Sequence, residues 1–124
     1  MDHRIPMGKA AEEYCVRQLR RQGWLVLARN WRIRSGELDI VALDGPVLVI
    51  VEVKAHRIGS RVGPTAPVYA VGPSKQRRIR RLAGAWVQAN GRRAAFSEIR
   101  FDVVGITFDR DGNMAGYEHL TDAF

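Results

Sequence analysis

The chain has a single cysteine, Cys15, among its 124 residues, so no disulfide can form within it. Such a composition is typical of proteins that work in a reducing compartment. Apolar runs such as Val47 to Val51 are far too short to span a bilayer. The first residues also lack the apolar segment of a secretory signal. These absences exclude a disulfide-stapled scaffold and favour a cytoplasmic protein without membrane spans.

Acidic residues are absent from Val53 to Ser97, a stretch that holds ten Lys or Arg residues. The whole chain carries a net charge of +7, and seventeen of its twenty basic residues are arginine. A block of one charge sign attracts polyanions, and the planar guanidinium group matches phosphate oxygens. The composition therefore favours nucleic acid as the partner, with an acidic protein, a membrane surface or a merely solvated face as the alternatives.

Several signatures of other chemistries are also missing. The chain contains no CxxC pair, no HExxH pattern and no Gly-x-x-x-x-Gly-Lys loop, so nothing indicates a zinc site or a nucleotide-binding loop. No repeat or linker divides it, and its length suits one domain spanning residues 1–124. Hydrophobic residues make up 46% of the chain, which is enough to fill one core.

Hydrophobic periodicity predicts two helices and five strands. A first helix is expected over about residues 8–22, where Ala11, Cys15 and Leu19 share an apolar face, so Cys15 is assigned to packing. Strands are expected over residues 24–28, 37–43, 47–54, 99–108 and 114–120. A loop over 55–73 precedes a second helix over 75–90, capped by Ser74. This αβββαββ order predicts an α/β fold with a mixed central sheet flanked by helices.

The expected second helix has two chemically different faces. Its inner face is apolar and consists of Ile79, Leu82, Ala83, Trp86 and Val87. Its other face carries Arg77, Arg78, Arg80 and Arg81. Lys75 precedes them and either binds a phosphate or simply begins the basic face.

The hairpin over residues 36–54 brings acidic side chains together. If Leu43 pairs with Leu48 across the turn, Asp39 lies opposite Glu52, and Glu37 lies opposite Lys54. Directly opposed residues have Cβ atoms roughly 4.5 to 5.5 Å apart. Two carboxylates at so short a distance repel one another, and a divalent cation such as Mg²⁺ or Mn²⁺ removes this repulsion. The pairing therefore predicts a nuclease-type metal site built from Asp39, Glu52 and Lys54.

Placement distinguishes these residues from ordinary surface charges. A Glu-x-Lys on an exposed strand is common surface decoration. Here Glu52 and Lys54 end the most hydrophobic strand, and Asp39 stands between two apolar residues of its own strand. Charges in such positions are costly unless something uses them. The placement therefore favours a site.

Three segments resemble motifs of the YraN family, which are small bacterial proteins predicted to be endonucleases and distantly similar to archaeal Holliday junction resolvases. The segments are Gly36-Glu37-Leu38-Asp39-Ile40, Val51-Glu52-Val53-Lys54 and Arg100-Phe101-Asp102-Val103-Val104. The resemblance covers nearly the whole chain and implies the restriction-endonuclease-like PD-(D/E)XK fold. Asp39 would be its D, and Glu52-x-Lys54 its (D/E)xK. Leu38 stands in place of the proline, and Ala55-His56 separate Lys54 from Arg57 where the family has one residue.

The resemblance implies a metal-dependent endonuclease that acts on nucleic acid phosphodiester bonds, including those of branched or structured DNA. Asp39, Glu52 and the Val53 carbonyl would hold Mg²⁺ or Mn²⁺, and Lys54 would orient the attacking water. Glu12 of the first helix would complete the catalytic set, with neighbouring Glu13 as the plain alternative.

Basic residues are expected to grip the phosphate backbone without reading sequence. They are Arg57, Lys75, Arg77, Arg78, Arg80 and Arg81. The resemblance favours DNA over RNA and suggests a homodimer. Asp102 is expected to be structural, bridging to Arg100 or Arg29. The alternative function is a non-catalytic nucleic-acid-binding module that retains the nuclease fold.

Overall fold

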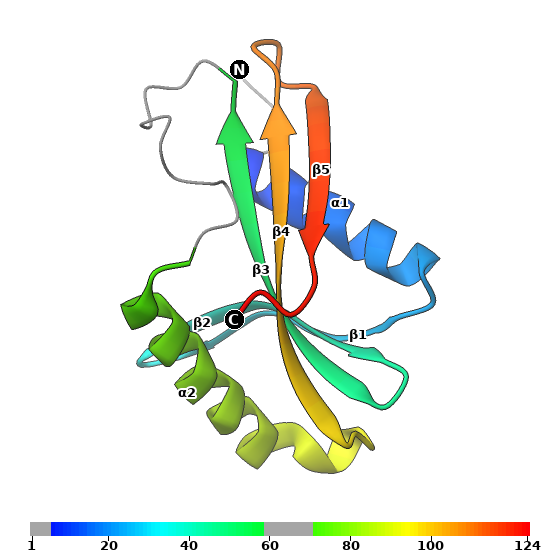
Figure 1. Cartoon of the computed structure of the whole chain (residues 1–124), viewed down its shortest axis with the longest axis vertical. Coiled ribbons are helices and arrows are strands. Elements are labelled where there is room, and N and C mark those ends of the chain that lie inside the picture. The colour runs from blue at the N-terminus through cyan, green and yellow to red at the C-terminus, as the bar shows by residue number, and fades with distance from the viewer. Residues whose placement is uncertain (1–5, 59–70) are drawn as a thin grey trace.

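The computed structural model describes residues 6–58 and 71–124, which form two helices and five strands in the predicted αβββαββ order (Figure 1). Their bounds are α1 Met7–Arg21, β1 Leu25–Ile33, β2 Gly36–Asp44, β3 Val47–Arg57, α2 Pro73–Asn90, β4 Glu98–Phe108 and β5 Met114–Leu120. A short 3-10 helix, Gly91–Arg93, follows α2. The expected order of elements is confirmed.

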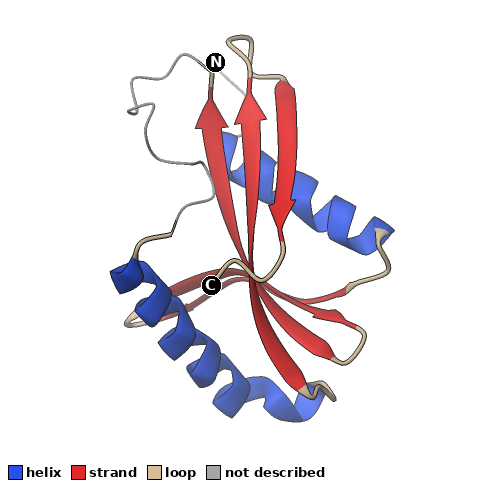
Figure 2. Cartoon of the chain, in the orientation of Figure 1, coloured by secondary structure: helices blue, strands red, loops and turns tan. Residues whose placement is uncertain are grey.

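The strands form one five-stranded sheet in the order β1-β2-β3-β4-β5. Neighbouring strands are antiparallel except β3 and β4, which run parallel. Parallel neighbours need a crossover connection, and α2 lies within it. Figure 2 shows the two helices on opposite sides of the strands. The prediction of a mixed sheet flanked by helices is therefore confirmed.

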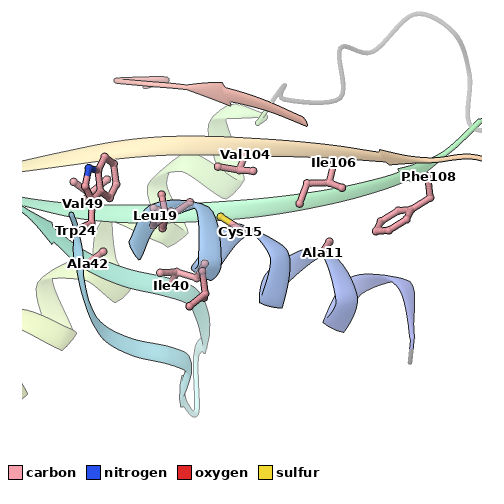
Figure 3. Close-up of a cluster of buried hydrophobic side chains, with 12 residues drawn as sticks. Ala11, Cys15, Leu19, Trp24, Ile40, Ala42, Val49, Val104, Ile106 and Phe108 are labelled. Carbon is pink, nitrogen blue, oxygen red and sulfur yellow. The ribbon is translucent and has the colours of Figure 1, made fainter. Parts of the chain in front are cut away.

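Each helix covers a separate part of the core. On the α1 side, Ala11, Cys15 and Leu19 pack against apolar residues of β2, β3 and β4 (Figure 3). On the α2 side, the predicted inner face of the helix packs on Leu48 and Ile50 of β3. Burial raises the pKa of the Cys15 thiol to about 12, so the thiol stays protonated at neutral pH. The packing role expected for Cys15 is confirmed.

Two strands are longer than their hydrophobic patterns predict. β1 runs on to Ile33 although its apolar run stops at residue 28, because its polar second half pairs with β2. β3 reaches Arg57, past the predicted end at residue 54, because it stays paired with β4 as far as Arg57↔Phe108. The predicted 55–73 loop is wrong at both ends, and its residues 59–70 lie outside the described part of the chain.

The predicted cap of the second helix is also wrong. Gly72 is the N-cap, Pro73 begins the helix, and Ser74 lies inside the first turn without capping it. Proline suits the first helical position because its fixed φ fits the helix and its missing N–H costs nothing there. The inner face is as predicted, with Ile79, Leu82, Ala83 and Trp86 buried.

The β2–β3 hairpin separates partway along its length. Its ladder has the predicted register from Asp44↔Val47 to Ile40↔Val51. Beyond that point β2 stays with β1, whereas β3 stays with β4, and Figure 1 shows the two pairs diverging. We call the point of divergence the fork. Asp39 and Glu52 are the next residues of the two strands, so the fork carries both predicted acids.

A local rotation of β1 and β2 accompanies the fork. Residues two apart on a regular strand share a face. Ile40, however, packs in the core under α1, whereas Leu38 packs in the core under α2. In β1, Asn30 has a positive φ of 49° and lies between the partners of Ile40 and Leu38. The regular alternation of side chains between the two sides of the sheet is therefore interrupted at Asp39. The Asp39 side chain lies at the opening between the strands.

A buried polar cluster lies on β4 at the level of the fork, because Asp102 pairs with Val51, the last β3 residue that pairs with β2. The carboxylate of Asp102 is fully buried and accepts hydrogen bonds from Arg100 Nε at 2.8 Å and Arg100 Nη2 at 3.0 Å. It also contacts His119 Nε2 at 2.8 Å and accepts the Asp122 N–H at 2.9 Å. Burial alone would raise the pKa of Asp102, but the hydrogen bonds outweigh it and lower that pKa. The structural role and the Arg100 partner are as predicted.

We expect Asp102→Ala to lower the free energy of unfolding by about 3 to 5 kcal/mol, because it leaves Arg100 and His119 without their buried partner. Asp44→Ala is the control, since the Asp44 side chain is 43% exposed and meets Arg100 only at 3.6 Å; its cost should be below about 1 kcal/mol. Urea unfolding measures both. Equal costs would contradict the assignment of Asp102 as the anchor of the cluster.

Candidate metal and phosphate site

The Asp39 carboxylate bridges the fork. Its Oδ2 accepts a hydrogen bond of 2.8 Å from the Val53 N–H, two residues past the last β2–β3 pair. A side chain thus takes the place of the backbone acceptor that β2 no longer provides. The N–H and C=O of one strand residue point to the same side of the strand. The Val53 carbonyl is therefore directed towards the fork as well.

Glu52 lies beside Asp39, as the hairpin pairing predicts. The pKa of Asp39 is raised to about 7, mainly by burial and secondly by repulsion from the Glu52 carboxylate. The Glu52 side chain is only 12% exposed, and its Oε1 lies 2.6 Å from Lys75 Nζ. Two carboxylates thus share one small, half-buried space.

Lys54 adds a positive charge to the same group. It lies two residues after Glu52 on β3 and therefore on the same face of the strand. Its pKa is lowered by burial and by the nearby Lys75, while Glu52 opposes the shift. The predicted pairing of Glu37 with Lys54 is wrong: β2 has left β3 by then, and Glu37 accepts a 2.7 Å hydrogen bond from Arg32.

A pocket of about 480 Å³ opens beside Asp39 on the α1 side of the fork, and neither Glu52 nor Lys54 lines it. Asp39 and Val53 form one wall, and the rest comes from α1, β1 and the start of β2. The residues that complete the lining are Gly8, Lys9, Glu12, Arg29, Asn30, Arg32 and Glu37. None of the lining side chains is aromatic, and most carry a charge.

Glu12 lines this pocket from α1 together with Gly8 and Lys9, and it is only 7% exposed. Its Oε1 accepts hydrogen bonds from Arg29 Nε and Asn30 Nδ2, both at 3.0 Å. Of the Glu12–Glu13 pair, Glu12 therefore faces the sheet, and it holds Arg29 rather than standing free beside Asp39.

In residues 6–58 and 71–124, no group of three or more His, Cys, Asp or Glu side chains could hold a metal ion. The oxygen donors at the fork are Asp39, Glu52 and the Val53 carbonyl.

The predicted phosphate-binding arginines occupy exposed positions. Arg77, Arg78 and Arg81 lie on the outer face of α2, and Arg57 lies exposed at the end of β3. Arg80 differs, because its guanidinium stacks 4.7 Å from the ring of Phe101 and 5.5 Å from that of Phe124. Arg80 thus has a packing partner within the fold.

Four polar residues of the pocket lie outside the predicted site. They are Lys9, Asn30, Arg32 and Glu37, and Arg29 was expected only as a partner of Asp102. The polar second half of β1 hid Arg29, Asn30 and Arg32, because its pattern indicates a loop rather than a strand. Arg29-Asn30 between an apolar run and the Gly36 motif was the available signal.

We expect Asp39→Asn to stabilise the metal-free protein at neutral pH. Asparagine keeps the acceptor for the Val53 N–H but removes the repulsion from Glu52. Because the pKa of Asp39 rises from 3.8 unfolded to about 7 folded, the native protein binds the extra proton and loses stability as pH rises between those values. The variant should therefore gain up to about 4 kcal/mol over wild type above pH 7 and little near pH 4. Urea unfolding in chelator from pH 4 to 8 tests this, and a pH-independent difference would contradict it.

Sequence comparisons place the chain in a family. The profile of the uncharacterised protein family UPF0102 matches residues 11–106. A UPF0102 protein of Rhodococcus jostii is 43% identical over 124 residues, covering 100% of both chains. A UPF0102 protein of Streptomyces coelicolor is 45% identical over 113 residues, covering 90% of this chain and 84% of the relative. In residues 6–58 and 71–124, no helix has the length and apolar character needed to cross a membrane. The chain belongs to the UPF0102 family, the YraN-like family that its motifs resemble.

Proposed function

We propose that this protein is a metal-dependent endonuclease that cleaves phosphodiester bonds in nucleic acid, with structured or branched DNA as the favoured substrate. The observation that supports this most directly is the gathering of Asp39, Glu52 and Lys54 at the fork of the sheet. These are the residues that the PD-(D/E)XK resemblance assigns to catalysis. The αβββαββ order and the mixed sheet agree with that superfamily.

The donors at the fork fit a hard divalent cation. Asp39, Glu52 and the Val53 carbonyl offer only oxygen atoms, which Mg²⁺ and Mn²⁺ prefer. Mg²⁺ commonly uses one or two protein carboxylates and leaves its other positions to water and substrate phosphates. A cation would also relieve the repulsion that Asp39 and Glu52 exert on one another. When bound, it would polarise the scissile phosphate and lower the pKa of an attacking water.

Lys54 provides the complementary charge. Its ammonium extends from the same strand face as Glu52 and can donate hydrogen bonds to the attacking water and to phosphate oxygens. Donors placed where negative charge develops stabilise the transition state more than the ground state. Lys54 is therefore the residue whose loss should affect cleavage far more than binding.

The pocket beside Asp39 suits the sugar–phosphate backbone next to the scissile bond. Lys9, Arg29 and Arg32 supply positive charge, and Glu12 orients the Arg29 guanidinium through its Nε. Bases are usually held by stacking on aromatic rings, which the lining lacks. Contacts between these basic side chains and phosphates hold the backbone without reading sequence. The exposed arginines of α2 would extend the phosphate contacts on the other side of the fork.

The second candidate is a binding module without turnover, and the exposed arginines of α2 would serve it equally well. Pure binding, however, gives no reason to place two carboxylates inside a phosphate-binding surface, where they repel the ligand.

We expect wild type to cut at least one of single-stranded, duplex, flap and four-way DNA substrates when Mg²⁺ or Mn²⁺ is present. Lys54→Ala and Asp39→Asn should abolish cutting, whereas the control Arg20→Ala, on the exposed side of α1, should retain it. Lys54→Ala should keep DNA affinity within a few fold of wild type. Failure of wild type to cut the whole panel, at high protein concentration, would refute the nuclease proposal and leave the binding module.

The logarithm of the association constant for duplex DNA should fall with the logarithm of the salt concentration. The slope should be about −0.9 for each phosphate neutralised. Replacing Arg77, Arg78 and Arg81 together by Gln should flatten that slope, because each is exposed on the outer face of α2. The matched control replaces Arg17, Arg20 and Arg21 of α1 by Gln, which removes the same charge elsewhere. Fluorescence anisotropy across a salt series measures both. Equal flattening in the two variants would mean that α2 is not the binding face.

A further inference from the structure

Lys75 occupies an unusual position for a cation. It lies in the first turn of α2, and its Nζ is 2.6 Å from Glu52 Oε1. The N-terminal turn of a helix carries a partial positive charge, which disfavours lysine, and this turn contains no acidic residue. The carboxylate that offsets this cost comes from the fork. Glu52 thus links the first turn of the basic helix to the candidate metal donors.

The charges at the fork balance when all four groups are ionised. Asp39 and Glu52 are negative, while Lys54 and Lys75 are positive and close enough to repel one another. A divalent cation between the carboxylates would bring this cluster to a net charge of +2. It would also compete with Lys75 for the oxygens of Glu52. A cluster of that charge attracts a phosphodiester far more strongly than a neutral one.

We propose that Lys75 is a positioning residue that holds Glu52 until a divalent cation binds, and that it then moves to a nucleic-acid phosphate. This rests on the proposed metal site. The Lys75 side chain is 39% exposed and has a flexible four-carbon stem, so it can turn outward once Glu52 binds the cation. Arg77 and Arg78 lie exposed in the same helix, so the released ammonium would join the phosphate contacts proposed for them. Cation binding and nucleic-acid binding would thereby favour one another.

The first test measures Mn²⁺ affinity alone, by calorimetry on the folded, full-length chain. Lys75→Gln should bind Mn²⁺ at least about fivefold more tightly than wild type, because the competing ammonium is gone. Lys75→Arg keeps a cation against Glu52 and should bind Mn²⁺ like wild type. If Lys75 only held Glu52 in a fixed place, Lys75→Gln would bind Mn²⁺ more weakly, and that result would overturn the proposal.

The second test compares the salt dependence of duplex binding in chelator and in Ca²⁺, with cleavage prevented by non-hydrolysable linkages. Lys75→Gln should match wild type in chelator, where Glu52 engages Lys75. In Ca²⁺ its log–log slope should fall below that of wild type by about 0.9, one phosphate contact. The control Arg77→Gln should lower the slope equally in both conditions. A Lys75→Gln slope that equals wild type in Ca²⁺ as well would overturn the transfer.

The outcomes separate this proposal from the nuclease proposal. Wild type that binds Mn²⁺ and cuts DNA, with unchanged Mn²⁺ affinity in Lys75→Gln, would refute the role of Lys75 alone. Wild type that binds no divalent cation would refute the metal site and, with it, the role of Lys75. Tighter Mn²⁺ binding by Lys75→Gln in a protein that cuts nothing would support the exchange at Glu52 and refute only the nuclease activity.

Discussion

The hydrogen bond from the Val53 N–H to the Asp39 carboxylate lies where β2 separates from β3. Backbone N–H and C=O groups buried in a sheet need hydrogen-bond partners. When one strand leaves its neighbour, the backbone groups between them normally lose these partners. Here a side chain supplies the missing acceptor, so β3 can continue with β4 while β2 turns away with β1. The opening between the strands, and every charged group gathered there, depends on this substitution of side chain for backbone.

The charges at the fork are held by contacts from several elements. Glu12 of α1 fixes Arg29 of β1, and Lys75 of α2 engages Glu52 of β3. Both helices thus contribute polar contacts to the fork in addition to covering the sheet. The ionised form of Asp39 is poorly stabilised at the fork, as its raised pKa indicates. A divalent cation would relieve the repulsion between Asp39 and Glu52.

The hairpin register, the α2 core face and the role of Asp102 could be predicted from sequence, because each depends on short-range spacing. The failure of the expected Glu37–Lys54 pairing could not be predicted, since the separation of β2 from β3 depends on how β1 and β4 pair with their other edges. The polar half of β1 looked like a loop because edge pairing, not burial, extends it. The partners of Glu12 and Lys75 bring together residues 17 and 23 positions apart in the chain, a long-range proximity that no local pattern encodes.

Asp39 and Glu52 together should bind a divalent cation, which a calorimetric Mn²⁺ titration of the wild type and of Asp39→Asn measures. Glu37→Gln is the control, because Glu37 lines the same pocket but is engaged by Arg32. We expect one Mn²⁺ site per chain in wild type and in Glu37→Gln, and none of comparable affinity in Asp39→Asn. Absence of Mn²⁺ binding to wild type, or equal binding to Asp39→Asn, would contradict it.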